Sequence, residues 1–363
     1  MLLVSLALSS SIAAAEQRDW DVLNDKLVAL VDEESIVGVA VGIVAHGEQV
    51  FARGYGHASL ERETAIDTRS VFHWASVSKP FVAIAVMQLV ERGELSVDDL
   101  LVERLPWFSM NDERYRDITL SQLLSHTSGM PDVDDYEWGN PQTDPGALKR
   151  WILDLEDEKL LFAPGADREY SNIGFEILGM VVQETAGMSF EDFMHENIFA
   201  ALEMNDTSFL VSDIDSALRV TGHTGRLWRR ATDAYHYNRR HAPSSTLNTN
   251  VSDMSKFAAE MLGDARILAP ETIATMWSVA WRDPDDETRT AALGWNVART
   301  WGGILAASHG GHDDGFRSYL YLAPEENVGI FMVSNDETIS ISQFMRTMLE
   351  FVFPEQATSE ANK

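Results

Sequence analysis

The chain has 363 residues, of which 45% are hydrophobic and 23% are charged, a composition typical of a globular protein. Its formal net charge of -29 excludes a nucleic-acid partner, because phosphate groups would be repelled, and it predicts a heavily hydrated surface. The chain contains no cysteine, so disulfides and thiolate catalysis are excluded.

Residues 1–15 form a short apolar run that ends in three alanines before Glu16. This pattern is typical of a signal peptide, and it predicts export to the periplasm or the cell exterior. No basic residues precede the run, so the alternatives are a true start upstream of Met1 and an ordinary apolar terminus. No later stretch is apolar for long enough to predict a membrane span.

Both ends of the chain carry the same kinds of element. Apolar residues at helical spacing predict a helix from Trp20 to Glu34, and two strands follow it around His46-Gly47. Residues 318–335 predict two more strands, and the periodic stretch from Ile339 to Phe353 predicts a helix. We therefore expect an α+β fold in which both termini build one antiparallel sheet covered by terminal helices.

The middle of the chain predicts a second, mostly helical lobe, with the active site between lobe and sheet. Its helix signals lie at Phe81–Arg92, Leu120–Ser125, Ser171–Ala186 and Asp253–Leu262. The expected division is a sheet domain at about 16–75 and 285–355, a helical lobe at about 76–284, and a tail at 356–363.

A Ser-x-x-Lys motif, Ser76 to Lys79, stands where the first helix of this lobe begins. A helix that starts at Ser76 places Lys79 one turn along on nearly the same face, within reach of the hydroxyl. The unpaired N–H group of Ser76 is suited to hold an oxyanion, and a buried Lys79 with a lowered pKa is suited to act as a base. The alternative is a lysine whose ammonium group reaches solvent.

Two further motifs follow in order, Tyr170-Ser171-Asn172 and His309-Gly310-Gly311, with ITLSQLLSHTSGMP and FAPGADREYSNIGFEILGMVVQETAG between the first and the last motif. The pattern resembles the serine penicillin-recognising superfamily, which includes class C β-lactamases, DD-peptidases, D-aminopeptidases and β-lactamase-like esterases. The similarity runs from about Val37 to Asn335 and implies the β-lactamase/transpeptidase fold.

The resemblance implies a catalytic role for three residues. Ser76 would be the acylated nucleophile and Lys79 its proton acceptor, and Tyr170 would shuttle protons to the leaving group. Two nearby cations are expected to favour the phenolate form of Tyr170. The resemblance implies no metal and no organic cofactor.

It also implies the substrate-binding residues. Asn172 would bind the substrate amide and Lys79, and His309, Gly310 and Gly311 would lie on the edge strand that lines the cleft. His312 would supply the second backbone N–H of the oxyanion hole. Trp301-Gly302-Gly303 is a weaker candidate for the same strand motif.

Most β-lactamases carry lysine where this chain has His309, and a neutral histidine attracts the β-lactam carboxylate less strongly. We therefore expect a serine hydrolase that cleaves small esters, amides or D-amino-acid peptides, a small-molecule partner and no membrane span. The alternatives are a β-lactamase or DD-peptidase, and a non-catalytic penicillin-binding-like sensor.

Four other features have a structural and a functional interpretation. His126 in HTSG is expected to close a helix. The His309, His312, Asp313, Asp314 cluster is not expected to hold a metal, because the two histidines have other roles and Asp313-Asp314-Gly315 is typical of a turn. Ser244-Ser245 replace a glycine pair of the family, with an uncertain effect on the pocket. The basic stretch at 223–241 is either a surface loop that pairs with neighbouring carboxylates or a cationic wall over the site that attracts an anionic substrate.

Overall fold

The computed structural model describes residues 18–61, 64–225, 228–263 and 266–356. The predicted signal peptide at 1–15 lies outside these ranges and stays a prediction, as does nearly all of the predicted tail. Within the described ranges, no helix is both long and apolar enough to cross a membrane.

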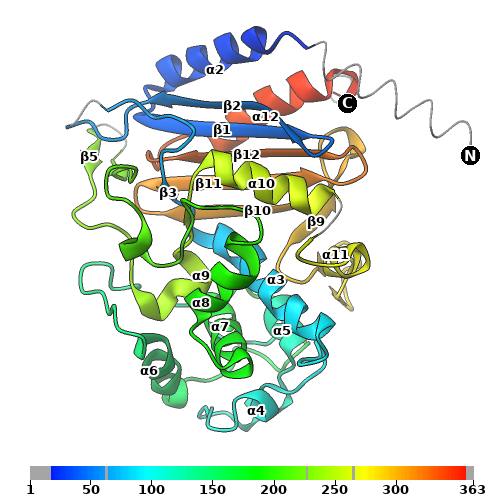
Figure 1. Ribbon diagram of the computed structural model, residues 1–363. Coiled ribbons are helices and arrows are strands. Elements are labelled where there is room, and N and C mark those ends of the chain that lie inside the picture. Colours follow the sequence, from blue (N-terminus) through cyan, green and yellow to red (C-terminus); the bar gives the residue numbers. More distant parts are fainter. Residues whose placement is uncertain (1–17, 62–63, 226–227, 264–265, 357–363) are drawn as a thin grey trace, which may run out of the picture.

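One antiparallel sheet of six strands is built from both ends of the chain (Figure 1), which confirms the predicted α+β fold class. The strand order is β2-β1-β12-β11-β10-β9, so the N-terminal hairpin pairs with the last strand of the chain. The strands are β1 (Gly38–Ala45), β2 (Glu48–Gly56), β9 (Asn296–Arg299), β10 (Leu305–Asp313), β11 (Phe316–Ala323) and β12 (Val328–Ser334).

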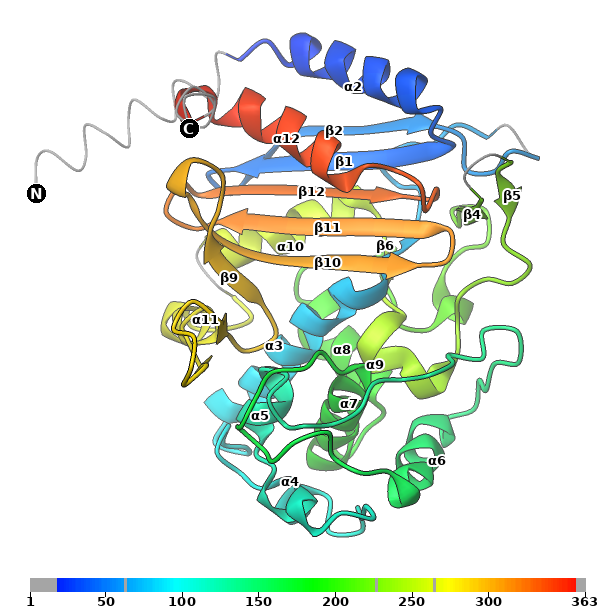
Figure 2. The same ribbon diagram turned by 180° about the vertical axis from the view of Figure 1, so that it is seen from behind.

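Helices cover both faces of this sheet (Figures 1 and 2). The terminal helices α2 (Trp20–Glu34) and α12 (Ile341–Val352) pack on one face, as the sequence predicts, and α10 (Val251–Leu262) from the middle of the chain packs on the other. Because both faces are covered, every residue of β1 is buried and the strand reads as one apolar run.

The remaining helices form the lobe below the sheet in Figure 1, and three of them lie close to the predicted ranges Phe81–Arg92, Leu120–Ser125 and Ser171–Ala186. The fourth helix predicted for the lobe, Asp253–Leu262, is α10 and packs on the sheet instead. The helices of the lobe are α3 (Ser78–Glu91), α4 (Leu101–Arg104), α5 (Leu120–Leu124), α6 (Ala147–Leu153), α7 (Asn172–Ala186), α8 (Phe190–Met194), α9 (Ala242–Ser245) and α11 (Pro270–Met276). Three two-stranded sheets lie outside the main sheet: β3 (Phe72–His73) with β6 (Asn248–Thr249), β4 (His223–Thr224) with β5 (Arg230–Ala231), and β7 (Trp281–Arg282) with β8 (Thr290–Ala291).

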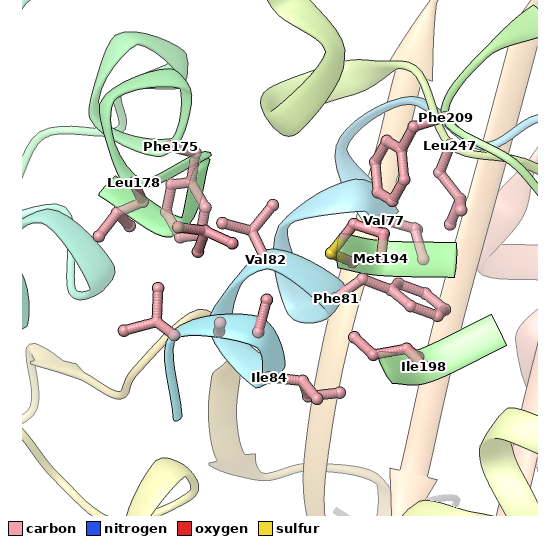
Figure 3. Packing of buried hydrophobic residues seen from close by; sticks show 14 of the residues in the cluster. Val77, Phe81, Val82, Ile84, Phe175, Leu178, Met194, Ile198, Phe209 and Leu247 are labelled. Carbon is pink, nitrogen blue, oxygen red and sulfur yellow. The ribbon is translucent and has the colours of Figure 1, made fainter. Parts of the chain in front are cut away.

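Helix α3 is enclosed on all sides. Each of its residues from Ser78 to Leu89 is buried. Figure 3 shows Val82 on the side of Phe175 from α7, and Phe81 on the other side of the helix near Met194 and Ile198. Such a helix is hydrophobic all round, so the first turn of α3 holds Lys79 in a dry environment.

The turn that leads into α3 is held in a strained conformation. Ala75 has a φ of 48°, which is uncommon for a residue other than glycine. The hydroxyl of Ser78 donates to the Ala75 carbonyl (2.7 Å) and accepts from the Leu247 N–H (3.0 Å). These bonds, made from two separate segments, fix the backbone directly before Ser76.

Strand β10 approaches this turn closely at Gly311. A β-carbon at Gly311 would collide with the carbonyl oxygen of Trp74 and the hydroxyl of Ser318. At the neighbouring Gly310, the nearest atom would lie 3.4 Å away, on the ring of Tyr319, which is ordinary contact. Gly311 therefore lets the sheet reach the backbone beside Ser76, whereas Gly310 has room for a side chain.

We expect Gly311→Ala to lower the free energy of unfolding by about 2 kcal/mol, because the added methyl group must displace backbone. Gly310→Ala is the matched control and should change it by less than about 0.5 kcal/mol. Thermal and urea unfolding of both variants would measure the difference. Equal stability of the two variants would contradict the close approach at Gly311.

Candidate active site

A cavity of about 540 Å³ lies where β10 meets the helical lobe, and Ser76 opens into it. All the predicted site residues line it except Lys79, which lies buried behind Ser76. The sequence-predicted residues in its wall are Ser76, Tyr170, Asn172, His309, Gly310, Gly311 and His312. Further residues line the cavity without a sequence signal that placed them there: Tyr136, Ser245, Asn296, Asp313, Arg317, Ser318, Tyr319 and Ile341.

Lys79 is fully buried, and its Nζ has three oxygen partners. These are the Oγ of Ser76 at 3.2 Å, the Oδ1 of Asn172 at 2.6 Å and the backbone carbonyl of Ser244 at 2.8 Å. An ammonium group has three N–H donors, so each donor is satisfied. The lysine therefore faces the serine, as the sequence predicted, and does not reach solvent.

Burial lowers the pKa of Lys79 to about 7, since a dry environment disfavours the charged amine. The negative charges of Asp132, Glu176 and Asp313 act in the opposite direction and keep the pKa from falling further. Near neutral pH a fraction of the molecules then carries a neutral amine beside Ser76.

Tyr170 behaves differently from the sequence-based expectation. Burial raises its pKa above the ordinary value, and this outweighs a hydrogen bond with Ser76, which lowers it. The Nζ of Lys79 lies 4.9 Å from the centroid of the tyrosine ring. The expected phenolate is therefore wrong for the free protein, because burial raises the pKa of Tyr170 and keeps it a phenol at neutral pH.

His126 supports Tyr170 instead of facing the cavity. Its ring stacks on the Tyr170 ring with centroids 4.4 Å apart, and its Nδ1 accepts from the Ser171 N–H at 3.2 Å. Burial, followed by the charge of Lys79, holds the pKa of His126 well below 6.5, so the ring is neutral. This is the structural role that the sequence favoured.

Asp132 orients Asn172, although no motif in the sequence pointed to Asp132. Its Oδ1 accepts from both the backbone N–H and the side-chain amide of Asn172, each at 2.8 Å. With its amide nitrogen held there, Asn172 turns its oxygen toward Lys79. Forty residues separate the two, and nothing in the sequence indicates that they touch.

Glu176 organises the third partner of Lys79. This fully buried carboxylate accepts from the Ser244 hydroxyl at 2.9 Å, lies 2.8 Å from the Nδ1 of His241, and also accepts from Trp151. These bonds hold the turn whose Ser244 carbonyl meets Lys79. The sequence signal that could have identified Glu176 is its charge within the otherwise apolar first half of α7.

Ser244 and Ser245 have different surroundings. The Ser244 side chain turns to Glu176 and is buried, whereas Ser245 lines the cavity.

His309 is neutral. Burial and the nearby Lys79 lower its pKa to about 3. Its Nδ1 lies 2.8 Å from the Gly310 carbonyl, and because a carbonyl only accepts, Nδ1 carries the proton. The Nε2 is left as an acceptor, so His309 cannot attract an anion by charge.

Strand β10, which carries His309 to His312, is an edge of the sheet over only part of its length. Strand β9 pairs with β10 as far as Asn296↔Ser308, and the register ends there. Residues His309 to His312 follow this point and keep their pairing with β11 alone, so their other side borders the cavity. Trp301–Gly303 forms a separate 3₁₀ turn and is not part of the described lining.

The basic stretch at 223–241 pairs with carboxylates. Arg229 meets Asp336 at 3.0 Å and Arg239 meets Glu191 at 2.9 Å. None of its described residues lines the cavity, so the structure favours pairing with neighbouring carboxylates over a cationic wall, and the two carboxylates are buried.

Asp313, at the end of β10, also has a partner within the protein. Asp313 lies 2.7 Å from the Nε2 of His73, which is buried. Across the described part of the chain, no group of three or more His, Asp or Glu side chains is arranged to hold a metal ion.

Solved structures with the same fold support this architecture. The octameric penicillin-binding protein homologue from Pyrococcus abyssi superposes with a TM-score of 0.79, at 22% identity, over 93% of this chain and 78% of that one. The structure of SurE gives a TM-score of 0.76, also at 22% identity, over 93% and 75%. At this identity the likeness shows the fold alone.

Sequence relatives extend the comparison. Protein flp of Staphylococcus aureus (strain COL) is 24% identical over 304 residues, which are 83% of this chain and 60% of flp. Penicillin-binding protein 4* of Bacillus subtilis (strain 168) is 34% identical over 164 residues, 44% of this chain and 35% of that protein. This chain thus spans about 60% of the length of flp. The Beta-lactamase family model matches residues 23–344, and the chain therefore belongs to that family.

Proposed function

We propose that this protein is a serine hydrolase that forms an acyl-enzyme on Ser76. The observation that carries the proposal is the buried Lys79, whose pKa lies near 7 and whose Nζ is 3.2 Å from the serine oxygen. A pure binding protein needs no base at this position, so this arrangement favours turnover over the alternative of a sensor.

The first step follows from the hydrogen bonds of Lys79. A neutral amine has two N–H donors and one lone pair, so it can keep donating to Asn172 and Ser244 while it accepts the proton of Ser76. The serine oxygen then attacks the substrate carbonyl, and Lys79 becomes an ammonium with three acceptors. We assign the oxyanion to the backbone N–H groups of Ser76 and His312, as the family resemblance implies.

Tyr170 supplies the next proton. As a phenol in contact with Ser76, it can protonate the leaving group and recover a proton from the Lys79 ammonium. Water then attacks the acyl group, and the same residues carry its proton in the reverse direction. Each step uses the protonation state that burial favours in the free protein.

The neutral His309 bears on the substrate class. It presents an acceptor and no charge, so we favour small esters, amides or D-amino-acid peptides over β-lactams. The Beta-lactamase family model, together with the penicillin binding named for the Bacillus subtilis relative, keeps a β-lactamase or DD-peptidase as the alternative. Parallel turnover assays with p-nitrophenyl acetate, D-alanyl p-nitroanilide and nitrocefin would separate these classes.

A fluorophosphonate should form a covalent adduct on Ser76, because proton removal and oxyanion stabilisation converge there. Intact-mass spectrometry and peptide mapping would locate the adduct. Ser76→Ala should abolish it, whereas Ser245→Ala, which removes another hydroxyl of the same cavity, should retain an adduct on Ser76. An adduct on another serine, or none in the folded protein, would overturn the proposal.

The pH dependence of kcat/KM for a neutral ester should report Lys79. Below its pKa the amine is protonated and cannot accept a proton, so the rate should fall as the pH drops through about 7. Lys79→Ala should lower kcat/KM about 10³-fold.

Asp132→Asn should shift this acid limb to lower pH, because the carboxylate that raises the lysine pKa is removed. Asp135→Asn, on the same loop, is the control and should leave the limb in place. A limb that is unchanged by Asp132→Asn would show that the titrating group is not Lys79.

A further inference from the structure

The part of β10 that carries His312 is supported by a neighbouring strand on one side only. Its pairing with β9 ends at Ser308, and from there β11 alone holds it in the sheet. We assign the backbone N–H group of His312 to the oxyanion, and such a donor must be in place before the charge develops. The position of this strand end therefore matters for the reaction.

Two contacts, one on each side of His312, tie the strand end to the segment that leads to the nucleophile. On one side, Gly311 comes so close to the Trp74 carbonyl that a β-carbon there would collide with it. On the other side, the Oδ2 of Asp313 lies 2.7 Å from the Nε2 of His73. His312 thus lies between two adjacent attachment points.

The segment at the other end of these contacts is itself fixed. His73 on β3 pairs with Asn248 on β6, and the Trp74 N–H donates to the Leu247 carbonyl at 2.8 Å. Two residues later the chain reaches Ser76, whose N–H is the second donor assigned to the oxyanion. The contact between His73 and Asp313 therefore joins the two segments that supply the donors.

His73 is fully buried, although its ring is polar. Four aromatic rings surround it at centroid distances of 5.5 to 6.5 Å, those of Trp138, Tyr235, His236 and Phe316. A carboxylate only accepts, so Nε2 donates to Asp313, and Nδ1 has no hydrogen-bond partner among the described residues. A buried polar atom without a partner is costly. An apolar side chain would avoid this cost, so the bond with Asp313 is what distinguishes His73.

The carboxylate of Asp313 also lies in a sensitive place. It is in the cavity wall, and its negative charge is felt at Lys79, where it raises the pKa of the amine. A carboxylate that was free to turn toward the oxyanion would repel the negative charge that develops there. The bond with the buried His73 ring fixes where that charge lies.

We propose that His73 and Asp313 are positioning residues of the oxyanion hole. Their bond fixes the His312 N–H relative to the Ser76 N–H and holds the Asp313 carboxylate against the buried histidine. Neither side chain touches the reacting atoms. This inference rests on the proposed acyl transfer to Ser76 and deepens it by adding two residues that act through the strand end.

Asp313→Ala tests the pair at its more exposed member, and Asp314→Ala, which removes the next carboxylate along the chain, is the matched control. Steady-state turnover of p-nitrophenyl acetate is measured per active site, counted by end-point labelling with a fluorophosphonate. Acylation and deacylation both pass through an oxyanion, so Asp313→Ala should lower kcat about tenfold and change KM less than about twofold. Asp314→Ala should leave both constants within about twofold of the wild-type values.

A second readout separates position from charge and from stability. Phenylboronic acid forms a tetrahedral adduct with a serine nucleophile, and Asp313→Ala should weaken its inhibition about tenfold. Asp313→Asn keeps an oxygen that can accept from His73 and should recover part of kcat. If only the charge of Asp313 mattered, both variants would raise kcat, because a negative charge beside the oxyanion is removed. If the pair only stabilised the fold, the melting temperature would fall while kcat per active site stayed constant.

Variants of the partner test the same bond from its other end. His73→Gln retains an N–H donor near the position of Nε2 and should keep more of kcat than His73→Leu. The double variant His73→Leu/Asp313→Ala should be no slower than the slower single variant, because both changes remove one bond. If the buried His73 variants do not fold, the three aspartate variants decide the question alone.

A kcat within about threefold of wild type for Asp313→Ala, a raised kcat, a change confined to KM, or an equal fall for Asp314→Ala would overturn the inference. Each of these results leaves fluorophosphonate labelling of Ser76 intact and rejects only the role of His73 and Asp313. Absence of labelling and turnover in the wild-type protein would reject the acyl-enzyme itself.

Discussion

The burial of one amine beside one hydroxyl is the constraint on which this structure depends. An ammonium group that is removed from water is costly unless each of its donors is matched. Lys79 meets that condition through Ser76, Asn172 and Ser244, which come from three separate segments of the lobe. The fold must therefore hold α3, the start of α7 and the turn at α9 in register to within a hydrogen-bond length.

Neighbouring residues adjust the contact between Lys79 and Ser76 without taking part in it. Glu176 fixes the turn that carries the Ser244 carbonyl, and Asp132 fixes the orientation of the Asn172 amide. Both carboxylates also oppose the effect of burial on the lysine pKa. The same two groups thus set the geometry of the base and the pH at which it loses its proton.

The sheet contributes the other wall. Gly311 brings β10 against the backbone of Trp74, so the strand that faces the substrate is locked to the turn that carries Ser76. Beyond Ser308 the strand has no pairing with β9, which leaves one of its sides to the cavity. Rigid placement of the nucleophile and an open strand edge thus come from the same few residues.

The local signals in the sequence were enough for the fold class and for the residues of the three motifs. Periodicity of apolar residues is a property of neighbouring positions, so the terminal helices, the hairpins and α7 could be predicted within a few residues. The packing of α10 on the sheet could not be predicted, because an amphipathic pattern does not specify which surface covers the apolar face of a helix. The sequence also identified Ser76 and Lys79 as neighbours, since a helical turn relates positions three apart.

The partners and charges of the site were decided only in three dimensions. Asp132 and the Ser244 carbonyl reach Asn172 and Lys79 across long stretches of chain, and no spacing rule relates them. The phenol form of Tyr170 and the neutral form of His309 follow from burial, which a sequence does not state. No sequence signal marked Arg317, and the pairing of β11 with β10 brings it to the cavity wall. Desolvation and contact between distant segments are properties of the packed chain, and these determined how the site is charged.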